Sequence, residues 1–214
     1  MADRWVEHPI RPGGTGTPAS SVLAGLVVVV AVVSAVTPLL GWLAAGAAPS
    51  YAFQLWRPLL YGLTSGSLLQ AVINAVFLVL VGRALEPGFG SWQFASLYVL
   101  SGLGGAAALC LVGVPADVQG SMCGVFGILA AAAVVKHFRR EDVRSDIVLI
   151  SLFIIWSIVV GSAAWVADLG AVAVGVAVGL VQARIPLADR RRAVIGHVGV
   201  ALVCLVAIVA TWLR

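Results

Sequence analysis

Residues 147–181 read IVLISLFIIWSIVVGSAAWVADLGAVAVGVAVGLV, and this stretch decides the fold class of the chain. Its only charged residue is Asp168, and it is too long for one crossing of a bilayer, which takes about 20 apolar residues in a helix. Gly161 and Ser162 divide it into two crossings. Spanning segments are helices or closed barrels, because lipid offers backbone groups no hydrogen-bond partner, and this run lacks the alternation of barrel strands. It therefore predicts two transmembrane helices.

The same apolar pattern recurs along the rest of the chain. Hydrophobic residues make up 61% of the 214 residues, charged residues only 10%, and the mean hydropathy is +1.08. A soluble domain of this size could not carry that balance. We therefore predict an all-α polytopic membrane protein with seven spans. They are placed at residues 20–43, 67–84, 91–113, 119–137, 146–162, 164–183 and 193–213.

Basic residues are divided unequally between the two sides of the predicted membrane. With a cytoplasmic amino terminus, eleven of the 13 Lys and Arg residues lie inside, and only Arg57 and Arg214 lie outside. This asymmetry predicts an amino terminus in the cytoplasm and a carboxyl terminus outside. It assigns the net charge of +4 to orientation and contact with anionic lipid, so we expect the lipid bilayer, and not nucleic acid, as a partner. The inner residues are Arg4, Arg11, Arg83, Lys136, Arg139, Arg140, Arg144, Arg184, Arg190, Arg191 and Arg192.

Composition also bears on the amino-terminal tail, on cofactors and on the source. Residues 1–19 hold three prolines, three glycines and mixed charge, which predicts a flexible cytoplasmic tail before a retained first span. Cys110, Cys123 and Cys204 lie in different spans, so we expect no disulfide, metal or other cofactor. A bias toward Ala, Val and Arg favours a bacterial plasma membrane. No pattern indicates an oligomeric state.

Three further patterns concern loops and helix packing. Residues 48–67, APSYAFQLWRPLLYGLTSGS, are amphipathic and aromatic-rich, which suits a loop in the outer headgroup region, although an ordinary connecting loop also fits. Residues 82–90, GRALEPGFG, predict a compact inner turn forced by Pro87 and Gly88. Glycine strips in spans four and six predict that these helices touch. The strips contain Gly120, Gly124 and Gly127, and Gly170, Gly175 and Gly179.

Four polar residues within the spans are candidate site residues, because intramembrane polar groups are costly. Gln70 and Asn74 lie one turn apart in span two, Cys123 lies early in span four, and Asp168 lies early in span six. By the predicted topology all four lie near the outer surface and could form one shallow cluster. The alternative is that the amides bond neighbouring backbone and that the thiol is a small buried hydrophobe. The intramembrane carboxylate fits that alternative least well. His137 and His197 lie near the inner side, where interface anchoring is the expected role.

Structural motifs in this order resemble the rhomboid intramembrane serine proteases, over about residues 50–180. Trp56 and Arg57 resemble the family's WR pair in the first outer loop, and Gly82, Glu86 and Gly90 reproduce its GxxxExxxG pattern. The resemblance implies a six-helix membrane domain, residues 20–184, followed by an inner loop and a seventh helix in residues 185–214. By the predicted topology Arg57 and Glu86 lie on opposite sides of the membrane, so each is expected to be held locally.

The active-site motifs of the family are matched with substitutions. MCGVFG in span four corresponds to the family's GxSG region, which puts Cys123 at the serine position and Gly124 and Gly127 at its glycines. ADLGAVAVG in span six resembles AHLGGxxxG, which puts Asp168 at the histidine position and keeps glycines at 170 and 175. QAVIN in span two resembles HxxxN. The resemblance thus implies oxyanion-stabilising roles for Gln70, in place of a histidine, and Asn74.

The substitutions bear directly on chemistry. The family mechanism, as the resemblance implies it, needs a histidine that accepts and returns a proton at neutral pH. In water, aspartic acid has a pKa of about 3.9 and a cysteine thiol about 8.5, a mismatch worth roughly 6 kcal/mol against proton transfer. The leading hypothesis is therefore a rhomboid-like pseudoprotease that binds transmembrane segments of other proteins. The alternatives are an active intramembrane endopeptidase with Cys123 as nucleophile, and a small transporter with Asp168 as proton relay. An aspartyl intramembrane protease fits less well, because only one carboxylate lies within a span.

Overall fold

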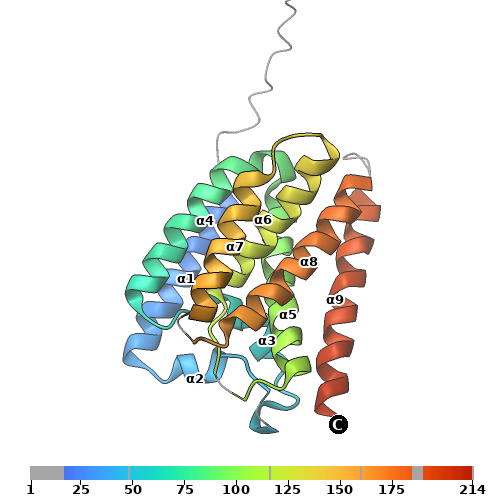
Figure 1. The fold of residues 1–214 in the computed structure, drawn as a ribbon. Coiled ribbons are helices and arrows are strands. Elements are labelled where there is room, and N and C mark those ends of the chain that lie inside the picture. Colours follow the sequence, from blue (N-terminus) through green and yellow to red (C-terminus); the bar gives the residue numbers. More distant parts are fainter. Residues whose placement is uncertain (1–16, 48, 116, 160, 185–189, 214) are drawn as a thin grey trace, which may run out of the picture.

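The computed structural model is a bundle of helices, and it describes residues 17–47, 49–115, 117–159, 161–184 and 190–213 (Figure 1). Six helices in this part of the chain are long and apolar enough to cross a membrane. The predicted fifth span is occupied by the shorter α7, of 16 residues. The long elements are α1 (Pro18–Val36), α4 (Leu68–Phe89), α5 (Ser91–Val112), α6 (Ser121–Phe138), α7 (Arg144–Val159), α8 (Ala164–Arg184) and α9 (Arg190–Trp212). The predicted tail, except for its last three residues, and the loop at 185–189 lie outside the described residues.

Two predicted boundaries are wrong, and proline is involved in both. The first span was expected to reach residue 43, but α1 ends at Val36 and a short α2 (Leu39–Leu43) follows. Thr37 is extended there (φ −136°, ψ 158°), as the residue before a proline prefers. Conversely, α4 runs through Pro87 to Phe89, because a proline in the last turn removes only one hydrogen bond. The turn comes instead at Gly90, whose φ of 85° favours glycine.

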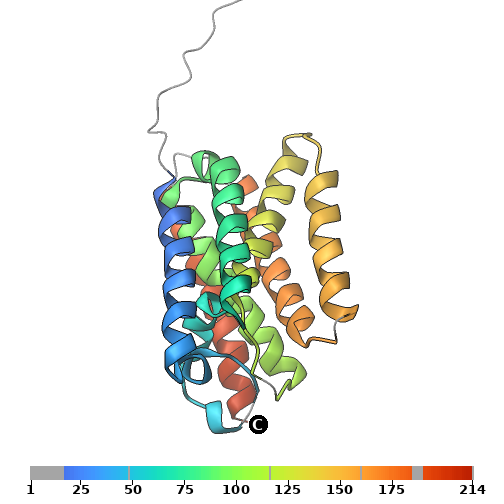
Figure 2. The same ribbon diagram turned by 90° about the vertical axis from the view of Figure 1, so that its left-hand side faces the viewer.

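Helix α5 is the centre of the bundle. Two thirds of its apolar window is buried, against 22–28% for α1, α4 and α9, and it packs against α1, α4, α6, α8 and α9 (Figure 1). Figure 2 shows α1 and α7 at opposite sides of the bundle. The peripheral helices α1, α4 and α9 therefore present most of their apolar side chains outward, as a protein surrounded by lipid requires.

The predicted contact between spans four and six is confirmed, since α6 and α8 form the most extensive helix pair. A methyl group at Gly175 would overlap the backbone of Gly127, so these two helices approach at glycine distance. The other glycines in the strips serve different neighbours. Gly124 faces the ring of Tyr98 on α5, and Gly170 lies against the backbone of Gly104 on the same helix. The strips therefore fasten both helices to α5 as well as to each other.

The GxxxExxxG segment joins α4 to the start of α1. Gly82 lets Ser20 of α1 lie directly against α4, where a methyl group would overlap it. The buried carboxylate of Glu86 accepts hydrogen bonds from the backbone N–H groups of Ala19 and Ser20, at 2.9 and 3.0 Å, and from the Ser91 hydroxyl at 2.6 Å. The expectation that Glu86 acts only at its own turn is wrong, because the first turn of α1 has free N–H groups that a carboxylate satisfies well.

Candidate functional site

Cys123 and Asp168 lie side by side near one end of the bundle. Cys123 belongs to the first turn of α6, and Asp168 to the second turn of α8. The close approach of these helices lets the Cys123 thiol donate to Asp168 Oδ1 across 3.6 Å. Both side chains are enclosed, with exposed fractions of 1% and 5%. The structure thus brings together the two residues that the sequence puts at the nucleophile and base positions.

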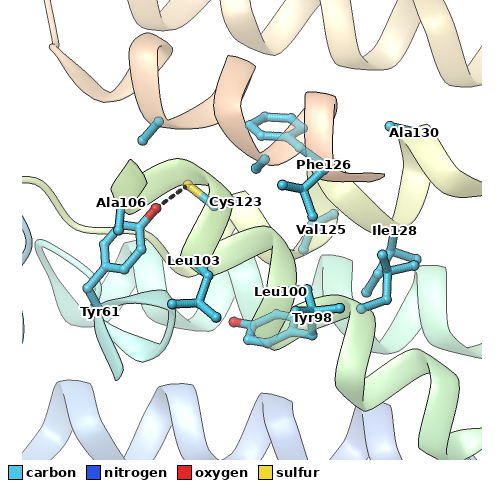
Figure 3. Packing of buried hydrophobic residues seen from close by; sticks show 14 of the residues in the cluster. Tyr61, Tyr98, Leu100, Leu103, Ala106, Cys123, Val125, Phe126, Ile128 and Ala130 are labelled. Carbon is cyan, nitrogen blue, oxygen red and sulfur yellow. Dashed lines mark hydrogen bonds between the residues drawn. The ribbon is translucent and has the colours of Figure 1, made fainter. Parts of the chain in front are cut away.

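A third side chain, Tyr61, closes this pair off from the side of the loop. It begins η2 (Tyr61–Leu63), has no exposed surface, and its hydroxyl donates to Cys123 Sγ at 3.4 Å (Figure 3). Two glycines make room for it. A methyl group at Gly120 would overlap the ring, and one at Gly105 would overlap the hydroxyl oxygen. The position of Tyr61 is therefore built into α5 and into the start of α6.

The hydrogen bonds of this trio run in one direction, from Tyr61 to Cys123 to Asp168. A nucleophilic cysteine must pass its proton to a base and approach a substrate carbonyl. Here the thiol donates its proton in a hydrogen bond to the Asp168 carboxylate, and the sulfur in turn accepts a hydrogen bond from the Tyr61 hydroxyl. As arranged, the trio is a buried polar network whose hydrogen bonds are satisfied.

The two predicted oxyanion residues lie apart from the trio in their bonding. Asn74 is buried and donates to the hydroxyl of Ser121, which also shares a hydrogen bond of 2.8 Å with Ser65. Gln70 is exposed, and its side-chain oxygen accepts from the backbone N–H of Gly66 at 3.1 Å. Among the described residues, neither amide bonds to Cys123 or Asp168. The predicted cluster is therefore two polar groups, with Gln70 outside both.

The predicted surface loop is partly drawn into the bundle. Arg57, in α3 (Trp56–Leu60), is buried and donates to the Ala44 carbonyl at 2.8 Å and to Gln54 Oε1 at 2.6 Å. Its guanidinium lies 3.9 Å from the ring centre of Tyr51, whose hydroxyl donates to Asp117. That hydrogen bond to a carboxylate raises the pKa of Tyr51. Arg57 therefore ties the loop together, while Trp56 stays 43% exposed.

The two described histidines lie away from Cys123. His137 is in the last turn of α6, about 20 Å along the helix from Cys123. His197 lies in α9, where its Nδ1 contacts the Ala193 carbonyl at 2.7 Å. Within the residues described, no three His, Cys, Asp or Glu side chains converge as metal ligands, and all three cysteines are free and buried.

Sequence reasoning missed Tyr61, Ser65 and Ser121. Two features of the sequence could have pointed to them. Tyr61 and Ser65 fall in the aromatic segment 48–67, and Ser121 is at the position of the first glycine in the GxSG pattern. Tyr98 was missed as well. Its hydroxyl, donating to the Gly62 carbonyl at 2.7 Å, fixes η2 against α5.

Comparison with known proteins places this site in context. Residues 52–185 match the model of the Rhomboid domain family. The chain is 28% identical to the human protein "Rhomboid-related protein 3" over 155 residues, which is 64% of this chain and 38% of that protein. It is 27% identical to "RHOMBOID-like protein 5" of Arabidopsis thaliana over 111 residues, 50% of this chain and 36% of that protein. The chain thus spans less than two fifths of the length of these relatives.

Proposed function

Since the chain belongs to the rhomboid family and is an integral membrane protein, we propose that it is a catalytically inactive member that binds transmembrane segments of other membrane proteins. The observation that carries this proposal is the buried series Tyr61–Cys123–Asp168, in which the thiol is a hydrogen-bond donor. In our proposal the active-site positions have become part of the packing of the bundle.

Three properties of the site support inactivity. Asp168 is a weak acceptor for a thiol proton, because the two groups differ by about 4.6 pKa units in water. The Tyr61 hydroxyl lies against the sulfur at 3.4 Å and limits the approach of a substrate carbonyl from that side. The trio has almost no exposed surface. Burial therefore keeps out the water that would have to hydrolyse the covalent thioester formed by a cysteine nucleophile. Each property alone slows peptide hydrolysis, and they act on different steps.

The binding part of the proposal rests on the outer helices. α7 packs against α6 and α8 only sparingly and barely touches α4, where Phe77 and Phe153 meet edge to face at 5.5 Å between ring centres. Apolar side chains are exposed beside this contact, one helical turn from the two rings: Ile73, four residues before Phe77 on α4, and Trp156, three residues after Phe153 on α7. A partner helix could pack there by displacing lipid, with van der Waals contact as the main gain.

We also propose an orientation and a location for the protein. The end of the bundle with the carboxyl ends of α4, α6 and α8 carries most of the basic residues, which supports a cytoplasmic position for that end, and hence for the amino terminus. The Cys123 end then faces outward, and so does the carboxyl terminus. A bacterial plasma membrane remains our proposal for the source, from composition alone.

Cleavage of a transmembrane model substrate in proteoliposomes tests the proposal, with an active rhomboid protease as positive control. We expect no product from the wild type or from Cys123→Ala. Product from the wild type that disappears in Cys123→Ala would establish the thiol endopeptidase instead. Proton flux abolished by Asp168→Asn would favour the transporter, although the enclosure of Asp168 argues against a water path.

Photo-crosslinking tests the binding part independently. A crosslinker placed at Ile73 of α4 should capture transmembrane proteins, whereas one at Val203 of α9, equally apolar and 70% exposed, serves as the control. Equal capture at both positions would count against a binding site between α4 and α7.

A further inference from the structure

A cavity of about 530 Å³ lies at the opposite end of the bundle from Cys123. The carboxyl ends of α4, α6 and α8 and the start of α5 form its walls, at the top of the view in Figure 1. Its volume is in the range that small-molecule sites have. The lining residues used below are Leu85, Phe89, Val135, Phe138, Arg139 and Gln182.

One wall of the cavity carries polar atoms that lack partners. The amide nitrogen and oxygen of Gln182 are both buried, and neither makes a hydrogen bond. Buried amide groups are nearly always satisfied by protein, by ordered water or by a ligand. Gln182 therefore marks the inner part of the cavity as a place where a hydrogen-bonding group is expected.

The charges around the cavity favour an anionic group. Lys136 lines it but is paired with Asp146 at 2.7 Å. Arg139, at the end of α6, also lines it and makes no ion pair among the described residues, with Glu141 at the same rim. Other basic residues gather at this end, and the two buried acids there are already bonded, Glu86 to α1 and Asp146 to Lys136. They include Arg83, Arg140, Arg144 and Arg184.

The rest of the lining is apolar and aromatic. Leu85 and Phe89 of α4 and Val135 and Phe138 of α6 form the side of the cavity between these helices. A free inorganic anion would leave this surface uncovered, whereas a ligand with both an anionic head and a hydrocarbon chain would use both parts of the lining. Helix ends of this kind lie at the depth of the lipid headgroups.

We propose that this cavity binds one anionic phospholipid from the adjacent leaflet. Its phosphate lies against Arg139, the buried amide of Gln182 turns into the cavity to donate to that phosphate, and the first part of an acyl chain lies along Phe89 and Phe138. Basic pockets between transmembrane helices on the cytoplasmic side are a recurrent arrangement for such lipids. The site is independent of Cys123 and of any partner at α4 and α7.

Native mass spectrometry of the full chain, released from detergent micelles, tests the proposal by titration with phosphatidylglycerol and with zwitterionic phosphatidylcholine. We expect one phosphatidylglycerol to be retained in preference to phosphatidylcholine. Arg139→Gln should weaken that binding roughly fivefold, as the loss of one basic contact with anionic lipid predicts. Arg140→Gln is the matched control, because Arg140 is adjacent and exposed but does not line the cavity. Val135→Trp, which fills the cavity, should abolish the preference, with lipid-free thermal unfolding as the check on folding.

Several outcomes would overturn the proposal. Equal losses in Arg139→Gln and Arg140→Gln would assign the effect to the general positive charge of this end. Unchanged binding in Val135→Trp would put the lipid elsewhere. Competition by millimolar inorganic phosphate would identify a soluble anion as the ligand, and equal retention of both lipids would show that the cavity does not select an anionic headgroup.

Discussion

Each end of the bundle holds a buried polar site, and the two sites differ in whether their side chains have hydrogen-bond partners. At the Cys123 end, the side chains of Tyr61, Cys123 and Asp168 bond to one another and leave almost no exposed surface. At the other end, the amide of Gln182 is buried without a partner beside a cavity of about 530 Å³. A fully satisfied network lowers the gain from binding a ligand, whereas an unsatisfied group beside empty volume raises it. On our proposals, the Cys123 end serves packing and the cavity at the opposite end binds a lipid.

The largest expected effect is a loss of stability at the Cys123 end. Gly105→Ala places a methyl group on the hydroxyl oxygen of Tyr61, so we expect a loss of about 3 kcal/mol in unfolding free energy, at the upper end for overpacking. Gly25→Ala in α1 is the control, since nothing lies within 4 Å of that position. Unfolding by SDS in mixed micelles, followed by circular dichroism, measures both. If the two variants unfold alike, Tyr61 is not held as tightly as described.

The next effect concerns Glu86, a buried and hydrogen-bonded carboxylate at the cavity end. Glu86→Ala leaves the backbone N–H groups of Ala19 and Ser20 without an acceptor, for an expected loss of about 2 kcal/mol in unfolding free energy. Glu86→Gln keeps one acceptor oxygen and should lose about half as much. The same SDS titration measures both, and an unchanged midpoint in Glu86→Ala would mean that the contact with α1 adds nothing.

A smaller effect separates Tyr61 from a neighbouring tyrosine. Tyr61→Phe and Tyr98→Phe each delete one buried hydroxyl donor, so each should cost about 1 kcal/mol. Only Tyr61→Phe removes a bond to Cys123, and it should therefore raise the labelling rate of that thiol by a few-fold. Equal labelling in the two variants would show that Tyr61 does not protect the sulfur.

The smallest expected effect has the opposite sign. Gln182→Leu removes a buried amide without partners, so in detergent without anionic lipid it should raise the unfolding free energy by about 0.5–1 kcal/mol. Added phosphatidylglycerol should stabilise the wild type more than this variant. A destabilised Gln182→Leu in lipid-free micelles would mean that the amide already has a partner, and the contrast between the two ends would weaken.

Some parts of the structure could be predicted from the sequence, for physical reasons. Spans are a property of local composition, because lipid selects apolar residues over every crossing, and the helices lie within a few residues of the predicted spans. The main exception is α1, which Pro38 ends early. The contact of α6 with α8 was predictable too, because glycines such as Gly127 and Gly175 announce close packing.

The site was less predictable because its bonds join distant segments. Cys123 and Asp168 were found through motif positions, but nothing local in the sequence ties Tyr61 to Cys123, 62 positions away. In the same way, Glu86 accepts a hydrogen bond from Ser20, 66 positions away. Only the fold brings the first turn of α1 close to Glu86. Gln70 was grouped with Asn74 by helical spacing, yet it lies in the first turn of α4 and is exposed.

The reactivity of Cys123 is the most direct test of whether its thiol is an inert part of the helix packing, because the measurement requires no knowledge of a substrate. The wild-type protein in liposomes is treated at neutral pH with a small membrane-permeable alkylating reagent, and mass spectrometry follows Cys123, Cys110 and Cys204 in the same molecules. All three thiols are buried, which makes the other two internal controls. We predict that Cys123 reacts no faster than Cys110 or Cys204. Preferential alkylation of Cys123 would contradict the account, because it would reveal an activated and accessible nucleophile.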